Sequence, residues 1–160
     1  ILQSRLKSNG LIPGIEIVKD YGALPKVECY PGQLNQVFMN ILGNAIDSLE
    51  NQPAPKTIEI STAVVASDSD AVESGKSIGQ LAVIRIRDSG PGLAEKAKLR
   101  LFDPFFTTKP VGKGTGLGLS ISYQIVVEKH GGSLKCISEA GQGAEFRIEI
   151  PLDRPAVVKK

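Results

Sequence analysis

The chain has 160 residues, a formal net charge of +2 at pH 7 and a charged fraction of 22%. This length suits one domain with a core of its own. The nearly balanced charge argues against nucleic acid or a membrane surface as a partner, and no apolar run approaches the roughly 20 residues of a membrane-spanning helix. Cys29 and Cys136 lack metal-ligand spacing, so we expect buried free thiols in a reducing cytosol.

Residues 1–10 read as the end of a helix that Asn9–Gly10 stops. They predict a remnant of a preceding segment, followed by one domain over 11–152 and a tail or linker over 153–160.

Apolar periodicity and turn residues predict an alternation of strands and helices inside the domain. Strands are expected over 14–20, 27–29, 57–66, 81–88, 134–139 and 144–151, and helices over 33–50, 95–101 and 117–130. The polar stretch 67–79 reads as a hairpin loop; its Gly75–Lys76–Ser77 is not a P-loop, because Asp70 stands where that motif requires a glycine. Strands separated by a few helices, with hairpins at both sheet edges, indicate an α/β (α+β) two-layer sandwich with a mixed sheet.

The helix expected over 33–50 carries two different faces. Its apolar stripe recurs at three- and four-residue spacing and predicts a core helix: Leu34, Val37, Ile41, Ala45 and Leu49. A second, narrow band is almost all amide: Gln36, Asn40, Asn44, Asp47 and Asn51. Because amides are poor helix formers, a row of them suits a cleft wall that coordinates a hard cation or binds a ligand. An amide-rich surface face is the alternative.

The strand expected over 81–88 ends in a carboxylate, Asp88, on its apolar side. A buried carboxylate needs a hydrogen-bond donor, and a ligand amine such as that of adenine would supply one. Guanine would present a second acceptor there and be rejected. Gly90 and Gly92 would let the backbone approach the ring closely, although a plain turn with an aspartate cap remains the alternative.

Alternating glycines over 112–118 open directly into the helix expected over 117–130. Exposed backbone N–H groups at a helix start favour a phosphate. The spacing fits no G-x-G-x-x-G register, which excludes a dinucleotide fingerprint. A flexible linker is the alternative, and the apolar Leu117 and Leu119 between the glycines argue against it.

Several motifs stand in order along the chain: Asn40-x-x-x-Asn44-Ala45, Asp88-x-Gly90-x-Gly92, Phe102-Asp103-Pro104-Phe105-Phe106, Gly114-Thr115-Gly116-Leu117-Gly118-Leu119, KHGG over 129–132 and GQGAEFRIEIP over 141–151. Together they resemble the catalytic ATP-binding domain of bacterial two-component sensor histidine kinases, in the gyrase/chaperone/histidine kinase/MutL superfamily. The resemblance covers about 14–152. It implies a Bergerat-type fold, in which about three helices cover one face of a mixed, mostly antiparallel sheet.

The resemblance also implies residue roles. Asn40 and Asn44 would be catalytic, with Asn44 as the Mg²⁺ ligand. Asp88 would recognise adenine through a hydrogen bond. Residues 102–114 would form a lid that Phe105 and Phe106 anchor. The implied ATP contacts are Asn44, Asp47, Asp88, Gly90, Gly92, Leu93, Phe105, Thr108, Lys109, Gly114, Thr115, Gly116, Leu117, Gly118 and Leu119.

Two departures from the family pattern bear on the chemistry. Many relatives carry a basic or aromatic residue where Asp47 stands, so that phosphate contact is in doubt, and Lys109 or Lys113 would supply the charge instead. ATP-hydrolysing branches carry a glutamate where Asn40 stands, and an amide cannot take its proton. We therefore expect poor hydrolysis and phosphoryl transfer to an outside nucleophile.

The resemblance implies that the phosphoacceptor histidine lies on a separate dimerisation domain, of which residues 1–10 are the last turns, and that a response regulator acts downstream. His130, the only histidine, reads as a helix C-terminal residue favourable to the dipole. We expect a monomeric fragment and a cytoplasmic domain, whether or not the parent protein is anchored to a membrane. A conformational ATPase and a serine kinase of the anti-sigma-factor type are the alternatives.

Overall fold

The computed structural model describes residues 14–67, 79–112 and 114–152. The N-terminal segment, the tail, most of the hairpin loop expected over 67–79 and Lys113 lie outside these residues. The elements in chain order are β1 (Glu16–Tyr21), α2 (Pro31–Leu49), β2 (Thr57–Ala66), β3 (Gln80–Asp88), α3 (Glu95–Arg100), α4 (Gly118–Tyr123), η2 (Gln124–Lys129), β4 (Ser133–Ser138) and β5 (Ala144–Pro151).

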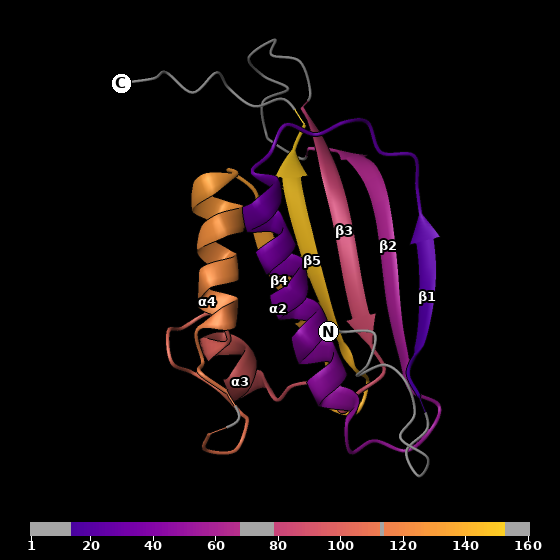
Figure 1. Ribbon diagram of the computed structural model, residues 1–160, viewed down its shortest axis with the longest axis vertical. Helices are drawn as coiled ribbons and strands as arrows, with labels where there is room; N and C mark the ends of the chain where they lie inside the picture. The colour runs from indigo at the N-terminus through magenta and orange to yellow at the C-terminus, as the bar shows by residue number, and fades with distance from the viewer. Residues whose placement is uncertain (1–13, 68–78, 113, 153–160) are drawn as a thin grey trace.

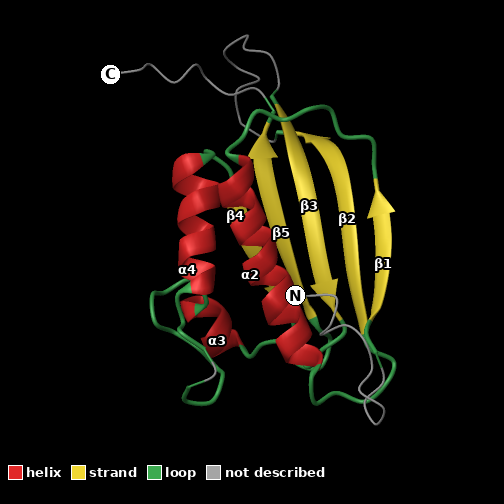
Figure 2. Ribbon diagram, in the orientation of Figure 1, coloured by secondary structure: helices red, strands yellow, loops and turns green. Residues whose placement is uncertain are grey.

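The five strands form one mixed sheet in the order β1-β2-β3-β5-β4. β1 pairs with β2 in parallel, and the other neighbours pair antiparallel. Helices α2, α3 and α4 lie on one face of this sheet (Figures 1 and 2). The predicted two-layer sandwich is therefore confirmed, and the site must form where the helical layer meets the ends of the strands.

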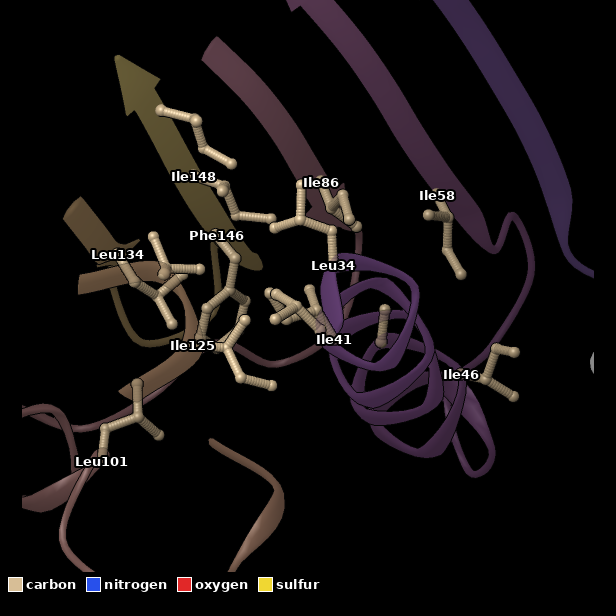
Figure 3. Close-up of a cluster of buried hydrophobic side chains, with 14 of the residues drawn as sticks. Leu34, Ile41, Ile46, Ile58, Ile86, Leu101, Ile125, Leu134, Phe146 and Ile148 are labelled. Carbon is tan, nitrogen blue, oxygen red and sulfur yellow. The ribbon is translucent and has the colours of Figure 1, made fainter. Parts of the chain in front are cut away.

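The core lies between the apolar stripe of α2 and the inner face of the sheet. Val37, Ile41 and Leu49 of α2 are fully buried, as are Ile58 of β2 and Ile148 of β5. Figure 3 shows Leu34 and Ile41 of the helix pointing toward strand residues such as Ile86 and Phe146. The three- and four-residue spacing read from the sequence is thus the spacing that buries this helix, and it turns the amide band away from the core.

Two expectations about the elements are wrong, and a third is right about the helix but not about its type. Residues 27–29 form no strand; Val27 and Cys29 pack against the core from an irregular segment bounded by Pro25 and Pro31. Only one sheet edge is a hairpin, β4–β5, because β1 reaches the other edge through the crossover that contains α2. The helix expected over 117–130 is α-helical only to Tyr123 and continues as the π-helix η2.

Cys29 and Cys136 are free and partly buried. Burial raises the pKa of the Cys136 thiol to about 11, with the positive charge of Lys98 opposing the shift. This thiol is therefore protonated at neutral pH. No helix in the described part of the chain is long and apolar enough to cross a membrane.

Replacing Gly43 by alanine should stabilise the domain. Gly43 lies inside α2, and a methyl group built on it meets no atom within 4 Å. Since glycine costs a helix interior about 0.5–1 kcal/mol relative to alanine, G43A should raise the free energy of unfolding by that amount in urea melts. An unchanged or lowered midpoint would show that the helix is strained at this position.

Candidate functional site

A cavity of about 580 Å³ opens between α2, the end of β3 and the joining segment, which is residues 101–117 between α3 and α4. Asn44 lines it from the helix, Asp88 from the strand, and Thr108 and Gly116 from the joining segment. Three parts of the chain that are distant in sequence therefore share one hollow, in the size range of small-molecule sites.

Part of the amide band forms one wall of this cavity. Asn40, Asn44 and Asp47 line it, whereas Gln36 is exposed and Asn51 follows the end of α2. The Asn40 amide donates to the Gly118 carbonyl at 3.1 Å and to the Ser122 hydroxyl at 3.2 Å. Asn40 thereby ties α2 to α4 and holds the start of α4 at the cavity.

Asp88 is 4% exposed and lies at the inner end of β3. Its Oδ1 accepts from the Gly90 backbone N–H at 2.9 Å. Burial raises the pKa of the Asp88 carboxyl above its ordinary value, while hydrogen bonds from Gly90, Ser48 and Ala144 and the charge of Arg87 oppose the rise. The Gly90 N–H thus supplies part of the donor set that the sequence assigned to a ligand. Sequence reasoning missed Ser48, whose hydroxyl lies near the carboxylate and donates to the Ala45 carbonyl at 2.8 Å.

The glycines after Asp88 are required by close packing. Gly92 has φ +72°, and a methyl group there would lie 2.2 Å from the Glu139 carbonyl oxygen. A methyl group on Gly90 would lie 2.7 Å from Asp88 Oδ1 and 2.8 Å from Ser48 Oγ. A side chain on Gly90 would therefore press on the carboxylate, whereas one on Gly92 would collide with the backbone of the turn between β4 and β5.

The joining segment closes on itself where Phe105 meets Gly116. The Phe105 N–H donates to the Gly116 carbonyl at 2.9 Å, and both residues have positive φ, 65° and 69°. The Phe105 ring is 74% exposed and lies outside the cavity lining. Phe106 lines the cavity instead, with the Arg100 guanidinium 4.9 Å from its ring centroid. Of the two expected anchors, only Phe106 therefore faces the cavity.

Lys109 reaches across the cavity from the joining segment to α2. Its Nζ donates to Asn44 Oδ1 at 3.2 Å and forms an ion pair with Asp47 Oδ2 at 2.5 Å. The acidic residue that departs from the family pattern is therefore paired with a cation in the structure.

Most of the residues predicted from the sequence come together. Those lining the cavity are Asn40, Asn44, Asp47, Asp88, Gly92, Leu93, Thr108, Lys109, Gly114, Thr115, Gly116, Gly118 and Leu119. Gly90, Phe105 and Leu117 do not line it. The lining also includes residues that were not predicted to bind ATP: Met39, Gly43, Ser48, Pro91, Leu101, Phe106, Thr107, Pro110, Ala144 and Phe146. Ser48 lies four residues after Asn44, so the helical period could have identified it.

His130 is the C-terminal cap of η2, as the sequence predicts. The imidazole is buried, its Nε2 accepts from the Tyr30 N–H at 3.1 Å, and its Nδ1 lies 2.7 Å from the Ile125 carbonyl oxygen. Since a backbone N–H can only donate, Nε2 is unprotonated and Nδ1 carries the hydrogen. The ring therefore joins the start of α2 to η2.

The fold and the cavity lining fit a catalytic ATP-binding domain, a class that the comparison with known families identifies. The family described as histidine kinase-, DNA gyrase B-, and HSP90-like ATPase matches residues 29–154, and the chain belongs to it.

Within that family the chain is similar to sensor kinases. It is 39% identical over 133 residues to Sporulation kinase E of Bacillus subtilis (strain 168), a match that covers 83% of this chain and 16% of that protein. The nucleotide-free catalytic domain of histidine kinase ThkA is 29% identical with a TM-score of 0.64, over 86% of this chain and 80% of that one. Full-length ShkA in complex with AMPPNP is 30% identical with a TM-score of 0.66, over 90% of this chain and 27% of that one. The chain is thus a catalytic domain of the sensor histidine kinase type that spans a small part of its curated relative.

Proposed function

We propose that this domain binds ATP in the cavity and transfers its γ-phosphoryl group to a histidine on a dimerisation domain of the same protein. The observation that carries the proposal is the meeting of Asp88, Asn44 and the glycine-rich start of α4 around one cavity. Because the chain covers only 16% of the kinase it resembles, the activity belongs to the longer protein.

Asp88 is suited to select adenine. The Gly90 N–H already donates to the carboxylate, which fixes its position, and Asp88 also lines the cavity. A carboxylate only accepts, so it favours the exocyclic amine of adenine over the carbonyl oxygen of guanine. We propose that the base lies beside Asp88, with Gly92 and Leu93 near its plane.

Asn44 is suited to hold Mg²⁺. Its amide oxygen already accepts from a cation, the Lys109 ammonium, so the negative end of the amide is directed toward positive charge at the cavity. Hard divalent cations prefer such oxygen ligands and complete their shell with phosphate oxygens and water. When bound there, Mg²⁺ would neutralise charge on the phosphates. No group of three or more His, Cys, Asp or Glu residues among the described ones could hold a metal.

Asn40 makes the domain a poor hydrolase on its own. Its amide cannot accept a proton at neutral pH, and its N–H groups point to Gly118 and Ser122 rather than toward a water molecule. Catalysis would then rest on positioning and charge neutralisation, with the nucleophile supplied from outside. The isolated chain should hydrolyse ATP more slowly than about 1 per second.

We propose a cytoplasmic location, with a dimerisation domain and a downstream response regulator as partners. The similarity to sensor kinases supports both assignments.

Incubation with γ-labelled ATP and a separately prepared dimerisation domain tests the reaction. We expect label on the dimerisation domain that is stable to base and labile to acid, as phosphohistidine is. Label that survives acid would indicate a serine kinase, and release of phosphate without protein labelling would indicate a conformational ATPase. Either result would overturn the proposal.

A further inference from the structure

The proposed metal ligand, Asn44, already binds a cation of the protein itself, the Lys109 ammonium. Lys109 Nζ lies 3.2 Å from Asn44 Oδ1, and the same ammonium is paired with Asp47. The Lys109 and Asp47 side chains are 30% and 29% exposed, so water only partly screens the pair.

Lys109 and a divalent cation cannot both bind Asn44 Oδ1 at the same time. Mg²⁺ binds an oxygen at about 2.0–2.1 Å, so an ammonium on the same oxygen would lie within a few ångströms of the metal. Like charges at that separation repel strongly in a partly buried site. The arrival of the metal must therefore move Lys109 away from Asn44.

Asp47 explains how Lys109 can move without leaving the site. The carboxylate lines the same cavity one turn after Asn44, and it still attracts the ammonium after Asn44 is released. Without Lys109, the negative charge of Asp47 would oppose an incoming polyphosphate. With Lys109 in place, the Lys109–Asp47 pair has no net charge, and the ammonium can also contact phosphate oxygens.

We propose that Lys109 is an internal substitute for the metal ion. In the free protein it occupies Asn44 Oδ1 and fastens the joining segment to α2. On binding of the metal–nucleotide complex it gives up Asn44, stays on Asp47 and contacts the phosphates. This inference rests on the proposed function of the cavity, and it assigns Asp47 as the positioning residue for Lys109.

Isothermal titration calorimetry of the whole chain with ATP tests the exchange, with and without Mg²⁺. The quantity compared is the ratio of Kd without Mg²⁺ to Kd with Mg²⁺. In K109M no internal cation offsets the phosphates, so the ratio should rise about tenfold, the effect of losing one charged hydrogen bond. In D47N the lysine is freed for the phosphates, so the ratio should fall below that of the wild type.

The matched control is Lys135→Met, which removes one lysine from β4, outside the cavity lining. It should leave the ratio unchanged. If K109M weakens both Kd values by the same factor, or D47N leaves the ratio as in the wild type, Lys109 does not exchange with the metal and the inference is overturned. If the wild type binds no ATP under either condition, the proposed function fails instead.

Hydrogen exchange of the nucleotide-free protein gives a second readout that needs no ligand. If Lys109 fastens the joining segment, K109M and D47N should both speed exchange of the amides over 107–118, while Lys135→Met should not. Equal protection in all four proteins would show that the contact does not hold the segment in solution, which would also overturn the inference.

Discussion

Asp88→Asn should lose most of its affinity for ATP while keeping its fold. The substitution replaces a carboxylate that accepts from the base by an amide whose N–H group would face the adenine amine. Loss of one charge-assisted hydrogen bond costs about 1.5–3 kcal/mol, which weakens binding about 10- to 100-fold. Thermal shift with ATP, read against the matched exposed variant Asp20→Asn on β1, measures the loss.

The stability of Asp88→Asn should depend on pH in a defined direction. Burial raises the pKa of Asp88 above 3.8 in the folded chain. The folded state then binds more protons than the unfolded state between the two pKa values, so this carboxyl stabilises the fold most at low pH and loses that contribution as pH rises. The free energy of unfolding of Asp88→Asn minus that of the wild type should grow as the pH rises above the ordinary pKa of an aspartate, about 3.9. A difference that shrinks over this range would show that the charged carboxylate is a net stabiliser.

Gly116→Ala should disrupt the joining segment and weaken nucleotide binding at least about tenfold. A non-glycine residue in the left-handed conformation costs about 1–2 kcal/mol, and a collision with the backbone of Phe105 adds to this cost. Gly116 has φ +69°, and a methyl group there would lie 2.4 Å from the Phe105 carbonyl carbon. The Phe105–Gly116 hydrogen bond that closes the segment would therefore have to open. Calorimetric titration with Mg²⁺ and ATP gives the affinity.

The matched control for that variant is Gly112→Ala in the same segment. Gly112 also has positive φ, +87°, but a methyl group on it meets no atom within 4 Å. Gly112→Ala therefore has the conformational cost without the collision, so its affinity for ATP should fall less than that of Gly116→Ala. Equal losses in the two variants would mean that strain alone, and not the contact with Phe105, sets the effect.

Sequence periodicity was enough to predict the helix that builds the site. The three- and four-residue spacing of the apolar residues in α2 fixes which face is buried, and Asn40, Asn44 and Asp47 then fall on the cavity side. Asp88 was predictable because alternation along β3 places it on the buried face. These features depend on residues close together in the chain.

Features that depend on distant contacts were not predictable. The family resemblance singled out Lys109 as one of two lysines near the phosphates, but no local pattern predicts that it pairs with Asp47 across the cavity. The parallel pairing of β1 with β2 depends on the path of the crossover. Residues 124–129 contain neither glycine nor proline, so no breaker marks the change to a π-helix. The contact between His130 and Tyr30 joins residues that lie 100 positions apart.

A crystal structure of the domain with a non-hydrolysable ATP analogue and Mg²⁺ tests the central claim most directly. The account predicts the adenine amine within hydrogen-bond distance of Asp88, the metal ion on Asn44 Oδ1, and Lys109 Nζ on Asp47 and a phosphate oxygen. A base bound away from Asp88, or a metal ion with no contact to Asn44, would contradict it.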